Sequence, residues 1–404
     1  MRLHFKEYKS WAWPLCALLF NLSRLVPFRD KNIWIMGNFE GKSYDDNTKY
    51  LYEYINENMP NKIKAVWFTK SKETAEKLKI RGYNSVIIGT WKSINYLLRC
   101  GVVVYTHSLY DFGRFPLMGG AYVVTTWHGM GFKKIYGSEW TGLGKLIRNI
   151  KDYFFKWIYC DCACLTSEYT KKQFSRTLGI DETKIFLTGQ PRNDVLMKAL
   201  NREAIMTPLG LPITKKLILY LPTWRNTFQE GKTLDILIQE LVDCESLNQV
   251  LLEKNYLFLI KLHPSTPIPT NLRLNENFKI ISYNAVSSNQ ELIGCGDILI
   301  TDYSSCFVDF ALMGKPIFFY TPDETEYLES CGGMEDDFYR ISYKCKCTNP
   351  ESLASLILEK PDIVARETNM IFDTTSTHLQ SFSQNVIDVV CKEIGLNKNS
   401  CCQE

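Results

Sequence analysis

The sequence contains no run of apolar residues long enough to cross a lipid bilayer. A spanning helix needs about 20 apolar residues, whereas the segment WAWPLCALLFNL (11–22) is shorter and is interrupted by Pro14. No small-residue cleavage site follows it, which argues against a secretory signal. Because Trp11, Trp13 and Phe20 lie beside basic residues, the segment is either an interfacial helix on a membrane surface or a helix packed against the first domain.

A large excess of charge is also absent. The 47 Lys and Arg residues against 44 Asp and Glu residues leave a formal net charge of +3, which is too weak to indicate a nucleic-acid partner. The basic residues gather in two segments, 1–31 and 131–156, and the first of these contains the apolar segment. Such patches suit an anionic membrane surface or a phosphate-rich substrate.

Signatures of metal binding are missing. No acidic cluster resembles a divalent-metal site, and the run CDCAC (160–164) has CxCxC spacing in place of the CxxC of common zinc sites. Many of the fourteen cysteines lie in predicted strands or helices, which indicates buried, reduced thiols of a cytosolic protein, with a metal or redox role as the alternative. We expect no cofactor.

No internal repeat or low-complexity segment is present, and 404 residues fit two domains. Short apolar strands alternate with helices up to residue 189, and the pattern restarts at residue 217 after a Pro/Gly/Thr-bearing linker (207–216). This alternation indicates an α/β fold with parallel sheets. The expected parts are an amphipathic membrane-associating segment (1–30), a Rossmann-like acceptor domain (31–205) and a Rossmann-like domain that binds the activated donor and carries the terminal helix (206–395).

One predicted strand runs directly into a cluster of small polar side chains. In GDILITDYSSCFVDFALMGKPIFFY (296–320), the strand ends at Thr301 and a helix begins near Ser304. Ligands of open parallel sheets lie beyond the carboxyl ends of the strands, and the free N–H groups of a helix start attract phosphate. Capping of the helix by Asp302 or Ser304 explains the same residues, so both readings stay open here.

Two of the five histidines follow predicted strands. His128, in VVTTWHGMGFKKIYG (123–137), lies in a glycine-bearing loop and is a candidate general base because its unperturbed pKa is near neutral. The alternative is a structural loop histidine. His263, in IKLHP, ends a strand of the second half, and Pro264 turns the chain there.

Cations follow two further strands. Arg225, in YLPTWRN (220–226), can clamp a phosphate through its forked N–H donors. Arg192, in LTGQPRNDVL (187–196), opens a predicted helix after a tight turn. Each cluster alone is explained by turn or cap chemistry, but five polar clusters that all follow apolar strands indicate convergence on one cleft.

Six segments, in this order, resemble the CDP-glycerol glycerophosphotransferase family of teichoic acid synthesis. They are SYDDNTKYLYEYI, TWHGMGFKK, TGQPRNDVL, LYLPTWRN, KLHP and ITDYSSCFVDFALMGKPIFFY. The resemblance implies a GT-B fold, in which two Rossmann-like domains face each other across a central cleft. It implies transfer of a polyol phosphate from a CDP-alcohol to a hydroxyl group of a membrane-linked acceptor, with release of CMP. It also implies a peripheral location on the cytoplasmic face of the plasma membrane.

The resemblance further implies roles for single residues. His128 would remove the proton from the acceptor hydroxyl, and His263 would contact the phosphates and steady the developing charge. Phosphoryl transfer needs such positioning and charge neutralisation more than covalent help, and GT-B enzymes usually supply these without a bound metal. The residues expected to bind substrate are Arg192, Asn193, Thr223, Arg225, Thr301, Asp302, Ser304, Ser305 and Asp309.

The sequence departs from the family pattern at two places. Met130 and Gly131 replace the Thr-Pro that often follows WHG, and the stretch after Tyr320 follows the family only loosely, so the acceptor side can differ. We expect CDP-glycerol as the donor, with CDP-ribitol as the alternative, and a lipid-linked glycan or a growing wall or capsule polymer as the acceptor. We expect no long extra N-terminal domain, and the size of the chain suits a stand-alone transferase that either adds a first unit or extends a short polymer.

Two other functions remain as alternatives. One is a nucleotide-sugar glycosyltransferase or epimerase of the same GT-B fold, which the TDYSS pattern disfavours. The other is a non-catalytic, membrane-associated binding protein, and the retention of both His128 and His263 argues against it.

Overall fold

The computed structural model describes residues 13–129, 132, 150–224, 234–263, 266, 268–269, 271–282, 285–286, 288–331, 333–359 and 381–396. The chain forms two compact units. The first consists of Met1–His128, Tyr136–Asp194 and Asp373–Glu404, and the second of Gly129–Ile135 and Val195–Phe372. Across the described ranges, no helix combines the length and the apolar character needed to cross a bilayer.

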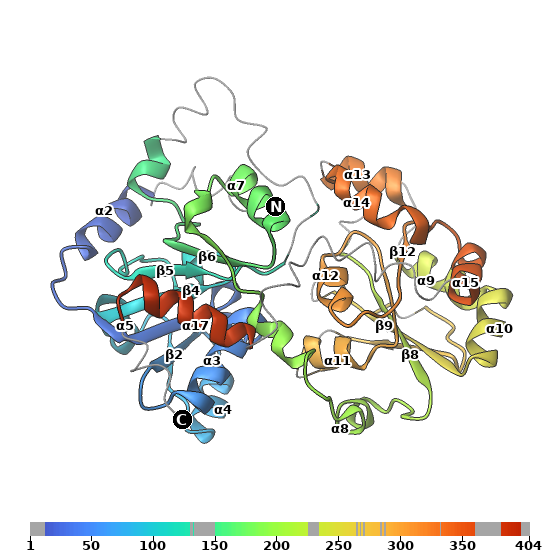
Figure 1. The fold of residues 1–404 in the computed structure, drawn as a ribbon. Coiled ribbons are helices and arrows are strands. Elements are labelled where there is room, and N and C mark those ends of the chain that lie inside the picture. The colour runs from blue at the N-terminus through green and yellow to red at the C-terminus, as the bar shows by residue number, and fades with distance from the viewer. Residues whose placement is uncertain are drawn as a thin grey trace. The chain divides into compact units, whose positions relative to one another are not determined.

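The first unit is built on a seven-stranded parallel sheet (Figure 1). The strands are β1 (Asp30–Gly37), β2 (Lys64–Thr69), β3 (Ser85–Ile87), β4 (Cys100–Tyr105), β5 (Tyr122–Thr125), β6 (Cys162–Leu165) and β7 (Ile185–Leu187). Their order across the sheet is β3-β2-β1-β4-β5-β6-β7, so the direction of winding reverses between β1 and β4. In doubly wound sheets, ligands bind at this reversal, beyond the carboxyl ends of the strands.

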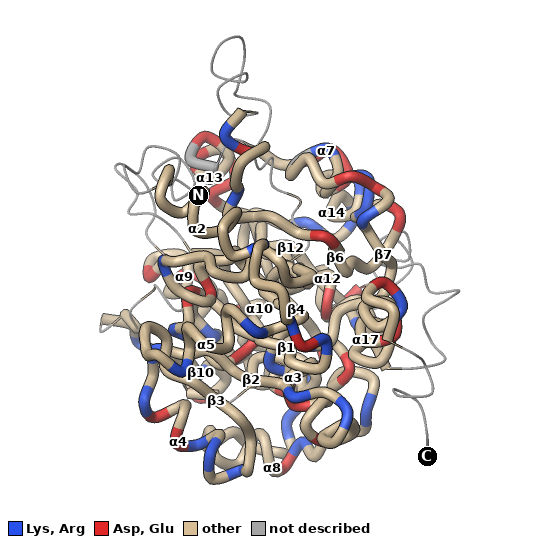
Figure 2. The backbone as a smooth tube through the Cα atoms, turned by 90° about the vertical axis from the view of Figure 1, so that its left-hand side faces the viewer, with Lys and Arg blue, Asp and Glu red and all other residues tan. Residues whose placement is uncertain are grey.

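Helices cover both faces of this sheet, so its strands read as nearly continuous apolar runs. The helices are α2 (Trp13–Ser23), α3 (Asp46–Asn58), α4 (Lys72–Ile80), α5 (Trp91–Arg99), α7 (Glu168–Leu178) and α17 (Phe382–Glu393). Ile35 of β1 faces a core that includes Phe20 of α2 and Leu97 of α5. The neighbouring Trp34 points to the opposite face, where α3 and α17 pack. Charged residues occur along α3, α4, α7 and α17, whereas α2 carries none (Figure 2).

The second unit repeats the same topology with six parallel strands in the order β10-β9-β8-β11-β12-β13. The strands are β8 (Lys216–Leu221), β9 (Tyr256–Lys261), β10 (Phe278–Ile281), β11 (Ile298–Thr301), β12 (Ile317–Tyr320) and β13 (Lys346–Cys347). The helices are α8 (Arg202–Met206), α9 (Leu234–Asp243), α10 (Glu245–Glu253), α11 (Asn289–Cys295), α12 (Cys306–Ala311), α13 (Glu324–Cys331), α14 (Asp336–Ser342) and α15 (Pro350–Glu359). The winding reverses between β8 and β11.

The predicted α/β architecture is confirmed, and every strand expected from the sequence is present. The division of the chain differs from the predicted one. The main crossover to the second unit follows Asp194 instead of residue 205, and the terminal helix α17 belongs to the first unit. The reason is the apolar face of α17, where Val386, Ile387 and Val390 are fully buried against the first sheet.

Candidate active site

The strand register of the first unit brings two histidines together. Tyr105 at the end of β4 pairs with Thr125 at the end of β5, and the amide of Thr126 extends the pairing by donating to the Tyr105 carbonyl. The loops that follow therefore leave the sheet side by side. The rings of His107 and His128 lie parallel, with their centroids 4.1 Å apart and an interplanar angle of 2°.

The hydrogen bonds of His128 define its neutral form. Nδ1 lies 3.1 Å from the carbonyl oxygen of Thr106. A carbonyl only accepts, so Nδ1 carries the proton and Nε2 carries the lone pair. The side chain has an exposed edge, yet loss of hydration and the neighbouring His107 lower its pKa below the usual value.

The loop that carries His128 is held by the start of α3. The fully buried Asn47 donates from Nδ2 to the carbonyl of Trp127 at 2.9 Å and to Oε1 of Gln190 at 3.0 Å. Trp127 has a positive φ of 53°, a conformation that costs a bulky residue free energy and needs such support. The segments SYDDN, TTWHG and TGQPRN thus meet at one place.

Arg192 and Asn193 lie in a short 3-10 helix (Pro191–Val195), where the sequence predicted the start of a helix. The Arg192 guanidinium donates to Oδ1 of Asp46 at 2.8 Å and to the His128 carbonyl at 3.0 Å, and its side chain is 9% exposed. Asn193 is 1% exposed. Arg192 thus helps to position the His128 loop, and the substrate contact predicted for these two residues stays a prediction.

In the second unit, the predicted corner after β11 is joined to the end of β8. Asp302 is fully buried, and its carboxylate accepts from the Thr223 amide at 3.0 Å, the Thr223 hydroxyl at 2.5 Å and the Tyr303 amide at 2.6 Å. Asp302 therefore fixes the shape of the strand ends at the reversal of winding, and it does not cap α12. Thr301 donates from its hydroxyl to the Leu221 carbonyl.

The small residues of the same corner surround the start of α12. The Ser304 hydroxyl accepts from the amide of Cys306 at 3.4 Å, and Ser304 and Ser305 are both partly exposed. A Cβ at Gly129 would lie 2.6 Å from Oγ of Ser305, so a larger residue there would require the Ser305 side chain to move. Asp309 is buried within α12.

The end of β9 brings His263 next to this corner, because β9 neighbours β8. His263 is exposed, and its ring centroid lies 6.4 Å from that of Trp224, which follows β8. The predicted residues Thr223, Thr301, Asp302, Ser304 and His263 thus line the carboxyl edge of the second sheet. Arg225 lies outside the described residues.

Sequence reasoning missed His107, Asp46 and Asn47 as parts of the site. His107 offered the same signal as His128, since it also follows a buried strand by a few residues. Asp46 and Asn47 were interpreted as the start of a helix and as part of the family-like segment SYDDNTKYLYEYI, without a role in the site, because a cap residue and a loop-binding residue look alike in sequence.

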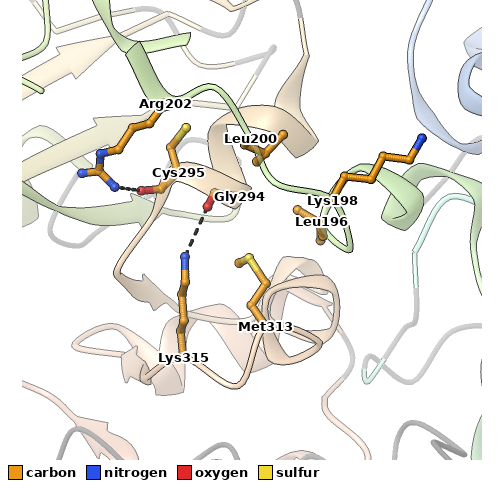
Figure 3. A pocket seen from close by; sticks show the side chains of 8 residues that line it. All are labelled: Leu196, Lys198, Leu200, Arg202, Gly294, Cys295, Met313 and Lys315. Atoms are coloured by element: carbon orange, nitrogen blue, oxygen red, sulfur yellow. Dashed lines mark hydrogen bonds between the residues drawn. The ribbon is translucent and has the colours of Figure 1, made fainter. Parts of the chain in front are cut away.

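A pocket of about 380 Å³ lies at the opposite, amino edge of the second sheet (Figure 3). Two of its lining cations, Arg202 and Lys315, are occupied by carbonyl groups at the end of α11. Lys315 donates to the carbonyls of Gly294 and Gly296, and Arg202 donates to that of Cys295 at 2.6 Å. Cations at a helix C-terminus stabilise the unpaired carbonyls. The pocket is therefore separate from the candidate site.

The cysteine run and the acidic residues give no metal site within the described ranges. There, no group of three or more His, Cys, Asp and Glu side chains is placed to hold a metal ion. Cys160, Cys162 and Cys164 are buried free thiols, and burial raises the pKa of Cys160 to about 12.

Comparison with known proteins assigns the chain to a family. The family model described as CDP-glycerol:poly(glycerophosphate) glycerophosphotransferase matches residues 18–390. A teichoic acid poly(glycerol phosphate) polymerase of Staphylococcus epidermidis is 29% identical over 320 residues, which cover 74% of this chain and 42% of the relative. One of Bacillus spizizenii is 28% identical over 353 residues, which cover 83% and 85%. The chain thus spans less than half of the first relative and most of the second.

A solved structure of the wall teichoic acid polymerase TagF is similar to the whole chain. Its TM-score is 0.69 at 25% identity, and the match covers 97% of this chain and 96% of that one. This likeness, together with the two parallel sheets, confirms the predicted GT-B fold. The chain, with its paired histidine loop and its Asp302 corner, belongs to the CDP-glycerol:poly(glycerophosphate) glycerophosphotransferase family.

Proposed function

We propose that the chain transfers glycerol phosphate from CDP-glycerol to a hydroxyl group of a membrane-linked glycan or polymer and releases CMP. Family membership supports the reaction class, and the names of both relatives support glycerol phosphate. CDP-ribitol is the alternative donor, because ribitol-phosphate enzymes are among the further relatives. The product would belong to a teichoic-acid-like or capsular polymer.

The observation that carries this proposal is the hydrogen bond from Nδ1 of His128 to the Thr106 carbonyl. It directs the lone pair to Nε2, which can take the proton of the acceptor hydroxyl. The acceptor oxygen then attacks the phosphorus that carries the glycerol. The bond from this phosphorus to the bridging oxygen breaks, and CMP leaves with the electron pair.

The second unit would bind the diphosphate. His263 offers a ring N–H, and Thr301, Ser304 and Ser305 offer hydroxyl groups beyond the strand ends, where donors can stabilise charge on the phosphates. Arg225 would add a cation. Asp302 would act indirectly, by holding Thr223.

The proposed location is the inner face of the plasma membrane, through a surface on the first unit. The helix α2 buries Phe20 and exposes Leu15, Leu18 and Leu22 by 44%, 55% and 52%. Exposed Leu25 and Phe28 follow α2 in the chain, and the segment that carries Ile150, Tyr153 and Phe154 lies next to α2 because Asn21 donates to the Phe154 carbonyl. We call this set the α2 surface; it consists of Leu15, Leu18, Leu22, Leu25, Phe28, Ile150, Tyr153 and Phe154.

The reaction is tested by CMP release from purified protein, with CDP-glycerol or CDP-ribitol and with or without a lipid-linked acceptor. We expect acceptor-dependent release from one donor. The substitution His128→Asn should lower turnover by about 100-fold or more and leave CDP-glycerol binding intact, because it removes only the base. The matched control is Lys77→Ala, on the exposed surface of α4, which should not change turnover.

Two outcomes would contradict the proposal. Near-normal turnover of the His128→Asn protein would exclude His128 as the base. Absence of CMP release from either donor, with the acceptor present, would exclude the reaction and leave the fold and the family membership in place.

A further inference from the structure

The ring of His107 is held in place by the loop in which it lies. The carboxylate of Asp111 is fully buried, and it accepts from the amides of Thr106 at 3.3 Å, His107 at 3.1 Å and Glu40 at 2.8 Å. Phe39 contacts the His107 ring at an angle of 62°, with the centroids 5.2 Å apart. The turn after β4 therefore has little freedom, and the His107 ring presents a fixed face to His128.

One threonine determines the protonation of both rings. Asn38 donates from Nδ2 to the Asp45 carbonyl, so its Oδ1 accepts from the Thr106 hydroxyl at 2.6 Å. The Thr106 oxygen then accepts from Nδ1 of His107 at 2.9 Å. The carbonyl of the same residue accepts from Nδ1 of His128. Both neutral rings therefore carry their lone pair on Nε2.

We propose that His107 is a positioning residue for His128: its ring, stacked at 4.1 Å, holds the base flat against the turn after β4 and shields one of its faces from water. This role rests on the proposed function of His128. The pair lies beyond the carboxyl ends of β4 and β5, beside the reversal of winding between β1 and β4 at which a doubly wound sheet receives its ligand.

The electrostatics of the pair agree with this geometry. Burial lowers the pKa of His107 to about 4, and burial followed by repulsion from His107 lowers the pKa of His128. Three other charged groups face the pair: Asp46 raises the pKa of His128, Arg192 lowers it, and Asp111 lies at the backbone of the turn. A lowered pKa keeps the base neutral as the pH falls below 6.5. The acid limb of kcat/KM should therefore lie below pH 6.5.

The test compares the wild type with His107→Phe and His107→Ala. The first readout is the pKa of His128, measured by NMR titration of isotope-labelled histidine and assigned with His128→Asn. The second is the pH profile of CMP release. The His107→Ala substitution exposes the His128 ring to water, so it should raise the pKa of His128 by about one unit and lower kcat about tenfold. Phenylalanine keeps a flat ring, so it should shift the pKa less and preserve most of kcat.

Identical His128 pKa values and identical acid limbs in all three proteins would overturn the inference, since His107 would then only fill space. Equal loss of kcat in both variants without any pKa shift would do the same. If the wild type releases no CMP, the proposed function fails, but the NMR titration still decides whether the stacked ring sets the protonation of His128.

Discussion

Asp302 shows what a single residue does at the strand ends of the second unit. Its two carboxylate oxygens accept from the amide and hydroxyl of Thr223 and from the amide of Tyr303, and water does not reach them. A buried acceptor with several N–H donors around it is costly to alter, because each donor left unpaired loses its hydration without compensation. Asp302 thus connects β8 and β11 at the reversal of winding.

We expect Asp302→Asn to destabilise the protein by about 2–4 kcal/mol, because the amide group turns a donor toward the Thr223 amide. The measurement is urea denaturation followed by intrinsic fluorescence. The matched control is Asp243→Asn on the surface of α9, where the contact with Gln239 is exposed and the change should stay within about 0.5 kcal/mol. Equal stabilities of the two variants would show that the Asp302 contacts do not hold this corner.

The sequence alone marked several residues as candidates for the site, but it predicted only part of what each residue contacts. The position of His128 after a strand was enough to mark it as a candidate base. Arg192 looked like a phosphate ligand, yet it is buried against Asp46, because its partner lies 146 positions earlier in the chain. Sequence reasoning missed His107 because its contact with His128 depends on the pairing of β4 with β5, which no local pattern reveals.

At the scale of elements, α17 shows how a distant residue can start a helix. The first four N–H groups of a helix lack partners within it. Asp194 accepts from the amides of Phe382 at 2.6 Å and Ser383 at 3.0 Å, and Ser381 accepts from the amide of Gln384. A carboxylate at this end also interacts favourably with the helix dipole. Asp194 thereby joins the end of the TGQPRND segment to the C-terminal helix.

We expect Asp194→Ala to cost about 1–3 kcal/mol and to loosen the start of α17, because two buried amides lose their acceptor. Hydrogen exchange should accelerate across residues 382–393 before it does so elsewhere in the first unit. Asp388→Ala, on the same helix, removes only a contact with Gln384 and serves as the control. Unchanged exchange in the Asp194→Ala protein would mean that packing alone holds the helix.

Sequence reasoning placed the terminal helix α17 in the second domain, whereas it belongs to the first unit. Its apolar periodicity is visible in the sequence, but periodicity says only that one face is buried and not against which sheet. The partner was decided by Asp194 and by Gly189, where a Cβ would overlap the Phe382 ring. Such pairings join residues about 190 positions apart, beyond the reach of any local pattern.

At the scale of the whole molecule, repetition of one topology explains why the fold was predictable. Both sheets place their first strand in the interior and reverse direction beside it, which is the usual result of right-handed crossovers between parallel strands. The polar clusters after the strands therefore had to gather at the carboxyl edge of each sheet. The edge strand β13 was not predicted, because it is short and pairs with β12 at only two positions.

The membrane attachment that we propose would depend on α2, which packs against the first unit, one of the two alternatives left open by the sequence. One face of α2 belongs to the core of the first unit through Phe20, and the other face is exposed. Deleting the helix would therefore damage the fold, and substitution of exposed leucines is the sharper test. Arg24 and Lys151, whose charges lie near Phe20 and Trp13, would face anionic headgroups.

We expect joint substitution of Leu15, Leu18 and Leu22 by Gln to weaken binding to anionic vesicles about 100-fold, since roughly 1 kcal/mol of apolar transfer is lost at each partly exposed leucine. The measurement is vesicle co-sedimentation at two salt concentrations, with Ile80→Gln as the control, because Ile80 is 84% exposed on α4 and lies away from α2 (Figures 1 and 2). CMP release from a water-soluble acceptor should be unchanged, because the substitutions leave the His128 loop untouched. Equal vesicle binding by the triple variant and the wild type would place the membrane contact outside the α2 surface.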